Sequence, residues 1–155
     1  MFNLPQELDA IRAELARDQI EYAICGGIAM AVHGFTRATE DIDLLIRPQD
    51  WARIKTAVAR LGFRFEAHPM SFSKGAMEIR RISKIDPADG DVLMLDLLLV
   101  TPASEGVWKN RQLLEWRGEP VWVVSREGLI ALKRFRSSDQ DLVDIRKLES
   151  GDESS

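Results

Sequence analysis

Apolar residues recur along the chain at two spacings, and each spacing predicts a different kind of element. Leu8, Ile11 and Leu15 lie at helical spacing and predict a first helix over residues 5–17. Short apolar runs that end at glycine or proline predict strands instead. The same two patterns predict further helices over 28–33, 49–61, 125–135 and 139–148, and strands over 20–25, 41–46, 63–67, 77–82, 91–100, 112–116 and 120–124.

Helices therefore interrupt the strands along the chain. This alternation predicts an α/β (α+β) fold in which helices flank a mixed sheet. Residues 117–119 (RGE) separate the last two strands and predict a hairpin. Residues 70–75 (MSFSKG) have the composition of a flexible loop, which we expect to border the cleft for an acceptor.

The length of the chain favours a single unit. Its 155 residues, 45% of them hydrophobic, suffice for one core and are too few for two. We expect one domain over residues 1–150 and a disordered polar tail over 151–155 (GDESS). The chain has no run of 18 apolar residues, and its start (MFNLPQELDA) lacks a basic, apolar signal sequence. We therefore expect no membrane span and a cytoplasmic location.

The charged and sulfur-bearing residues exclude several classes of protein. The 25 acidic residues outnumber the 21 lysines and arginines, which argues against a protein whose main task is to coat nucleic acid. One cysteine and two histidines exclude a disulfide framework and a Cys/His zinc site. A metal would have to be held by carboxylates, which suits Mg²⁺ or Mn²⁺.

Residues 23–46 combine a glycine pair with two aspartates. Gly26 and Gly27 stand between a predicted strand and helix, where glycine lets the backbone turn and a ligand approach, and where a helix start favours phosphate. After 13 further residues, Asp41 and Asp43 bracket Ile42. Because alternate residues of a strand point to one face, both carboxylates are expected to project together while Ile42 enters the core.

A third aspartate, Asp96, interrupts the apolar run over residues 91–100. An unpartnered carboxylate in such a strand would cost on the order of several kcal/mol, so Asp96 needs a counter-charge. One candidate is a divalent cation shared with Asp41 and Asp43, and the other is an arginine of a neighbouring strand, Arg80 or Arg81. Three converging carboxylates suit a two-metal centre, with ions roughly 3.5–4 Å apart.

These residues carry a resemblance to a known family. The pattern apolar-Gly-Gly, 13 residues, Asp-Ile-Asp-Leu and a later strand aspartate resembles the nucleotidyltransferase superfamily, with its polymerase-β-like fold. Lys133, Arg136, Asp141 and Asp144 form K-x-x-R-x4-D-x-x-D-I, which is similar to small bacterial nucleotidyltransferase-like proteins of the abortive-infection and toxin–antitoxin type. The resemblance covers roughly residues 20–148.

The resemblance implies a Mg²⁺- or Mn²⁺-dependent enzyme. It would transfer an NMP group from an NTP such as ATP to an acceptor hydroxyl and release pyrophosphate, with Asp96 helping to deprotonate the acceptor. Many relatives have Gly-Ser at the position of the glycine pair. Some carry a large helical second domain, which we do not expect in this chain. The implied metal ligands and catalytic residues are Asp41, Asp43 and Asp96, and the implied or candidate nucleotide-binding residues are Gly26, Gly27, Arg37, Thr39 and Lys133.

Each candidate residue also has a structural interpretation. Asp41 and Asp43 could pair with Arg37 or Arg47 at a strand end, and Lys133 could be a solvated lysine. Arg37 and Thr39 could lie in a solvated loop, with Thr39 bonded to its own backbone. Asp141 and Asp144 could form ion pairs with Arg136 or Lys147. Ser138 or Asp139 could cap the last helix.

The function also has alternatives. The chain could be a non-catalytic partner or antitoxin-like subunit on the same fold, bound to a cognate partner protein. It could also be a toxin whose acceptor is tRNA or a protein. The acceptor of the enzyme, whether a small molecule, tRNA or a protein, is left open by the sequence.

Overall fold

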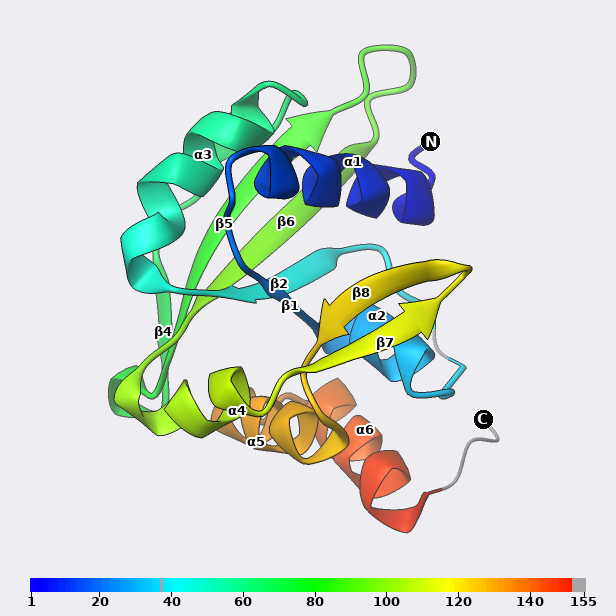
Figure 1. Ribbon diagram of the computed structural model, residues 1–155, viewed down its shortest axis with the longest axis vertical. Coiled ribbons are helices and arrows are strands. Elements are labelled where there is room, and N and C mark those ends of the chain that lie inside the picture. The colour runs from blue at the N-terminus through cyan, green and yellow to red at the C-terminus, as the bar shows by residue number, and fades with distance from the viewer. Residues whose placement is uncertain (37, 152–155) are drawn as a thin grey trace.

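The computed structural model describes residues 1–36 and 38–151, and the strands in them form one mixed sheet (Figure 1). The strands are β1 (Ala23–Cys25), β2 (Ile42–Ile46), β3 (Phe65–Glu66), β4 (Met70–Phe72), β5 (Met77–Ile85), β6 (Val92–Leu99), β7 (Gln112–Trp116) and β8 (Glu119–Val123). Their order is β3–β5–β6–β2–β1–β8–β7, and β4 pairs with the outer side of β5. The predicted α/β fold with a mixed sheet is confirmed.

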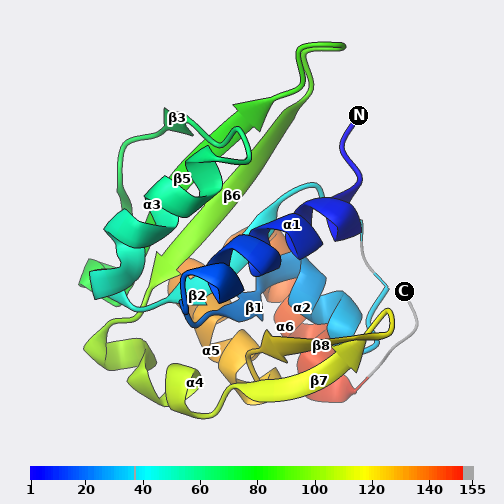
Figure 2. The same ribbon diagram turned by 45° about the horizontal axis from the view of Figure 1, so that its top comes forward.

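Helices cover both faces of this sheet. The α-helices are α1 (Leu4–Arg17), α2 (Gly26–Val32), α3 (Trp51–Ala59), α4 (Glu105–Lys109), α5 (Arg126–Arg136) and α6 (Asp139–Ser150), and short 3₁₀ turns are η1 (Pro48–Asp50), η2 (Ser73–Gly75) and η3 (Pro102–Ser104). Helices α1 and α3 contact each other over one face, whereas α5 packs against the opposite face together with α6 (Figures 1 and 2).

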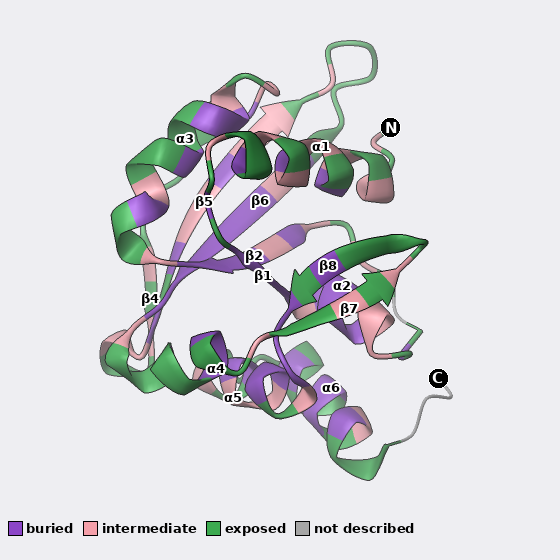
Figure 3. Ribbon diagram, viewed as in Figure 1, coloured by how far each residue is buried: buried purple, intermediate pink, exposed green. Residues whose placement is uncertain are grey.

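The central strands are apolar because both of their faces are covered. Strands β2 and β6 run parallel, and they are buried along most of their length (Figure 3). A parallel pair between two helical layers requires a nearly continuous apolar run rather than an alternating one. The runs IDLLI and VLMLDLLL fit this requirement except at their two aspartates, Asp43 and Asp96.

The hairpin and the final helices follow local signals. At the β7–β8 turn, Arg117 and Gly118 both have a positive φ, 52° and 80°, which matches the twist of a tight hairpin. Ser138 caps α6 through a bond from the backbone N–H of Asp141, so Ser138 rather than Asp139 is the cap. No helix among the described residues is long and apolar enough to cross a membrane.

Two expectations about elements were wrong, and one helix was missed. Residues 70–75 are not a loop, because Met70–Phe72 pairs with β5 as β4 and a 3₁₀ turn follows. The second helix begins at Gly26 itself rather than after the glycine pair, so both glycines belong to its first turn. The short helix α4 was not predicted. The tail expected over 151–155 falls almost wholly on residues 152–155, which lie outside the described residues.

Candidate functional site

Two aspartates lie side by side at the centre of the sheet. Asp43 on β2 and Asp96 on β6 are register partners in the parallel pair, so their side chains leave the sheet on the same face. Cys25, the last residue of β1, is the register partner of Asp43 on its other side. Asp41 immediately precedes β2, and repulsion between its carboxylate and that of Asp96 shows that it belongs to the same group of charges.

Among the described residues, no counter-charge is in contact with the carboxylate of Asp43. No hydrogen bond or ion pair from any described residue reaches it. Burial and the negative charge of Asp96 raise the pKa of Asp43 to about 7, although Arg136 acts in the opposite direction. Burial and Asp96 also raise the pKa of Asp41. The charged forms of Asp41 and Asp43 are therefore destabilised by the fold around them.

Asp96 is neutralised by an arginine of the next strand. Arg81 is its register partner on the antiparallel strand β5. The guanidinium donates from Nε to Oδ1 at 2.7 Å and from Nη2 to Oδ2 at 2.9 Å, so both carboxylate oxygens are used. Of the two counter-charges that the sequence left open for Asp96, the arginine is the one in place. Arg80 points to the other face, where its guanidinium lies 6.0 Å from the ring centroid of Trp51.

Gly26 is required by the position of Asp43. Gly26 has a φ of +66°, and a Cβ built on it would lie 1.9 Å from Oδ2 of Asp43. No other residue could occupy this position without displacing the aspartate or the start of α2. The backbone of the helix start thus lies directly against the carboxylate, while Gly27 is buried within the helix.

The donor set suits a hard divalent cation, but its present arrangement is not that of a loaded metal centre. Carboxylate oxygens are the ligands that Mg²⁺ and Mn²⁺ prefer, and a cation would neutralise the charge on Asp43. In residues 1–36 and 38–151, however, no three His, Cys, Asp or Glu side chains are grouped so as to hold a metal ion. The engagement of both Asp96 oxygens by Arg81 is consistent with this finding.

The other nucleotide-binding candidates have varied surroundings. Arg37 lies outside the described residues. Thr39 donates from its hydroxyl to the backbone carbonyl of Asp41 at 3.4 Å, so its local bond is to a residue two positions on and not to its own backbone. Arg47 pairs with Glu21 rather than with either aspartate of β2.

The C-terminal motif forms an ion network between α5 and α6. Lys133 is only 4% exposed, so its interpretation as a solvated lysine was wrong. Its ammonium lies 2.9 Å from Oδ2 of Asp144 and 3.7 Å from Oδ1 of Asp141. Arg136 donates to both oxygens of Asp141, at 2.8 and 2.9 Å, which confirms the ion pair that the sequence allowed. Although burial opposes the effect, hydrogen bonds from Arg136 and Ser138 lower the pKa of Asp141 to about 2.

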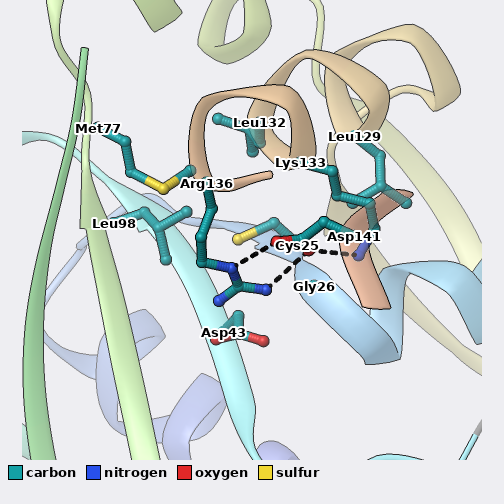
Figure 4. Close-up of a pocket in the computed structure, with 10 residues that line it drawn as sticks. All are labelled: Cys25, Gly26, Asp43, Met77, Leu98, Leu129, Leu132, Lys133, Arg136 and Asp141. Carbon is teal, nitrogen blue, oxygen red and sulfur yellow. Dashed lines mark hydrogen bonds and ion pairs between the residues drawn. The ribbon is translucent and has the colours of Figure 1, made fainter. Parts of the chain in front are cut away.

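This network borders a pocket that opens beside Asp43. Figure 4 shows the guanidinium of Arg136 between Asp141, to which it is bonded, and the carboxylate of Asp43. The cavity is small, with a volume of about 20 Å³. It is lined by Cys25, Gly26, Asp43, Met77, Leu98, Leu129, Leu132, Lys133, Arg136 and Asp141.

Arg81 and Arg136 are the residues of this site whose placement the sequence could not give. Arg81 was only one of two arginines that could reach Asp96, because the register between β5 and β6 is not encoded locally. Arg136 stands one helical turn after Lys133, and only the docking of α5 on the sheet directs it toward Asp43.

Comparison with solved structures identifies the fold. The chain is similar to the antibiotic-resistance factor ANT(2'')-Ia in solution, with a TM-score of 0.67, 16% identity and coverage of 94% of this chain and 82% of that one. It is also similar to the crystal structure of ANT(2'')-Ia in complex with adenylyl-2''-tobramycin (TM-score 0.65, 17% identity, 93% and 86% covered). The lincosamide antibiotic adenylyltransferase LnuA, in its lincomycin-bound crystal structure, matches with a TM-score of 0.61 and 17% identity over 94% of this chain and 96% of that one.

A scan of the sequence against protein-family models and a search of curated proteins found no match. The likeness is therefore one of structure, and it shows that the chain has the nucleotidyltransferase fold. The resemblance expected from the glycine pair and the aspartates is confirmed at this level. The narrower toxin–antitoxin type finds no support in these structures.

The raised pKa of Asp43 predicts a pH-dependent gain in stability for Asp43→Asn. The carboxyl of Asp43 has a pKa of about 7 in the folded protein and an ordinary value of 3.8 in the unfolded chain. The free energy of unfolding therefore falls as the pH rises from about 4 to 7 and above. The amide avoids this cost, so we expect a gain that vanishes toward pH 4 and reaches roughly 2 kcal/mol, or about 4–8 °C, above pH 7. Thermal unfolding between pH 4 and 8 measures it, with the exposed Asp9→Asn as control. A gain that does not grow with pH would contradict the assignment.

The contact between Gly26 and Asp43 predicts a large cost for Gly26→Ala. We expect a loss of about 2–4 kcal/mol, from the clash with Asp43 added to backbone strain. Gly75→Ala is the matched control, because Gly75 has a φ of +88° and nothing within 4 Å of a built Cβ, so it carries only the strain. Urea denaturation measures both. In a Gly26→Ala, Asp43→Ala double variant, the loss of the aspartate side chain should remove most of the cost that Gly26→Ala has beyond Gly75→Ala. Equal costs of Gly26→Ala and Gly75→Ala would show that the contact with Asp43 is absent.

The ion network predicts that Lys133→Met is strongly destabilising. Removal of the ammonium leaves Asp144 and Asp141 buried with fewer counter-charges, which costs about 3–5 kcal/mol for a buried pair. Lys109→Met, at a lysine whose side chain is 70% exposed, should stay within about 0.5 kcal/mol of the wild type. Equal stability of the two variants in urea would mean that Lys133 is not held as described.

Proposed function

We propose that this protein is a divalent-metal-dependent nucleotidyltransferase that moves an NMP group from an NTP to an acceptor hydroxyl and releases pyrophosphate. The nucleotidyltransferase fold supports this reaction class. The observation that carries the proposal is the half-buried carboxylate of Asp43, which lies in register with Asp96 and has no counter-charge in contact with it among the described residues. A structural aspartate at the centre of a sheet would have a partner, so the fold keeps this cost for another reason.

The reaction makes one bond and breaks one. The acceptor oxygen attacks the α-phosphorus, the bond from that phosphorus to the β-phosphate oxygen breaks, and pyrophosphate leaves. A divalent cation held by Asp41, Asp43 and Asp96 would supply Lewis-acid activation of the phosphoryl group and neutralise its charge. Asp96 takes the proton of the acceptor hydroxyl.

The remaining residues position the nucleotide. Gly26 is proposed to contact the triphosphate through its backbone, because it has no side chain to block the approach of a ligand beside Asp43. Arg136 faces Asp43 with the edge that Asp141 does not use, and this edge is suited to a phosphate oxygen (Figure 4). Lys133, whose ammonium lies 3.7 Å from Asp141, adds positive charge on the same side of the pocket. Arg37 and Thr39, in the segment before β2, are proposed to contact phosphate oxygens.

The acceptor is proposed to be a small molecule with a free hydroxyl. The similar structures include an adenylyl-2''-tobramycin complex and a lincomycin complex. We therefore expect ATP as the first donor to test, and hydroxylated antibiotics as the first acceptors. The net charge of −4 disfavours tRNA, which stays a proposed acceptor only for the toxin alternative.

A second candidate function is a non-catalytic subunit on the same fold that binds a partner protein. The observation that favours it is the bidentate hold of Arg81 on Asp96, which removes one of the three carboxylates from use. This candidate requires no nucleotide and no metal, so the same assay separates the two.

An NTP transfer assay tests the proposed function. Wild-type protein with Mg²⁺ or Mn²⁺ and each α-labelled NTP should transfer label to a hydroxylated acceptor and release pyrophosphate. Asp43→Ala should lower the rate by roughly 10²–10³-fold, since a metal ligand is worth several kcal/mol of transition-state stabilisation. Asp9→Ala, at an exposed helix position, is the control and should retain the wild-type rate. Wild-type protein that neither binds any NTP in calorimetry nor releases pyrophosphate would favour the non-catalytic subunit.

A further inference from the structure

Arg81 stands where a metal-loaded site would need a free carboxylate. Its two donors occupy both oxygens of Asp96 in the parallel, bidentate geometry that gives the strongest carboxylate pairs. Asp96 is in turn the register partner of Asp43, so the arginine lies beside the cluster that the proposed cation would bind. The arginine and a cation therefore compete for the same two oxygen atoms.

The charges favour the cation in this competition. Arg81 brings one positive charge to a group of three carboxylates, Asp41, Asp43 and Asp96, and it contacts only the last of them. The guanidinium of Arg136 is bonded to Asp141 and does not compensate Asp43 directly. A divalent cation carries twice the charge of Arg81 and can contact more than one carboxylate at once.

Arg81 is also the partner that can leave. The side chain of Arg81 is 31% exposed, whereas that of Asp96 is 3% exposed. A released guanidinium can therefore be hydrated, but a released Asp96 cannot, because its strand is buried on both faces. An exchange of counter-charge at Asp96 thus requires the arginine to swing out and a cation to take its place.

We infer that Arg81 is a built-in counter-ion that keeps Asp96 occupied in the metal-free protein and must release it before the site is loaded. This inference rests on the proposed function. It accounts for two observations together, the carboxylate donor set and the absence of a metal-ready group among the described residues. Arg81 acts through Asp96 and is a positioning residue. It weakens metal binding and stabilises the metal-free protein by neutralising Asp96.

The test is Mn²⁺ affinity, measured on the metal alone by calorimetry and by the paramagnetic resonance of free Mn²⁺. Arg81→Gln removes the competing charge and keeps a side chain of similar length. We expect it to bind Mn²⁺ at least about tenfold more tightly than the wild type, within the range of ordinary coupling between two ligands of one site. Without metal it should unfold at a lower temperature than the wild type, and Mn²⁺ should raise its melting temperature more.

Two further variants make the result specific. Arg80→Gln removes the same charge from the neighbouring residue on the other face, and it should leave the Mn²⁺ affinity at the wild-type value. Arg81→Lys keeps the charge and loses the two-pronged geometry, so its affinity should lie between those of the wild type and Arg81→Gln. It also serves if Arg81→Gln does not fold.

A merely structural role for Arg81 would give the opposite outcome. In that case both Arg81 variants would bind Mn²⁺ no more tightly than the wild type, and the inference would be overturned while the proposed function stood. Binding of Mn²⁺ by neither the wild type nor the Arg81 variants, even with ATP present, would overturn the inference and the metal-dependent function together.

Discussion

The parallel register between β2 and β6 is the constraint on which the candidate site depends. It places Asp43 beside Asp96 on one face of the sheet, and a slip of one residue would turn one of the two carboxylates to the opposite face. The apolar residues on either side help to fix this register, because the same slip would move the fully buried Ile42 and Leu44 from their packed positions to the face that now carries Asp43. The core of the protein therefore holds two repelling charges together, and the raised pKa of Asp43 records the cost.

The arginines around the cluster are distributed unevenly. Arg81 neutralises Asp96 from β5, and Arg136 neutralises Asp141 from α5, each with a bidentate pair. Asp43 lies between these two pairs, and no described residue forms such a pair with it. Such an arrangement does not stabilise a domain. In the proposed site, however, the negative charge of Asp43 would attract a cation, and the neighbouring arginines would offer N–H donors to a phosphate chain. The ion pairs of the C-terminal motif hold α6 against α5 and thereby orient Arg136.

The sequence predicts those features that depend on local spacing. The alternation of Asp41, Ile42 and Asp43 gave the correct face for Ile42, and the apolar run around Asp96 marked a central strand. Features that depend on pairing between distant segments were not predictable in the same way. The strand Met70–Phe72 exists because β5 offers it an edge, and its own three residues carry no strand signal. Lys133 has the surroundings of a solvated lysine on its own helix, and only α6 buries it.

We propose that the fold leaves Asp43 without a counter-charge from any described residue so that a divalent cation can bind there. Carbon-13 NMR titration of the aspartate side chains, with Asp43 assigned through Asp43→Asn, tests it most directly. The account predicts a pKa of about 7 for Asp43 in the absence of metal. It also predicts a fall below the ordinary value of 3.8 when Mg²⁺ and a nucleotide are added, because the cation favours the charged form. An ordinary pKa that Mg²⁺ leaves unchanged would contradict the account.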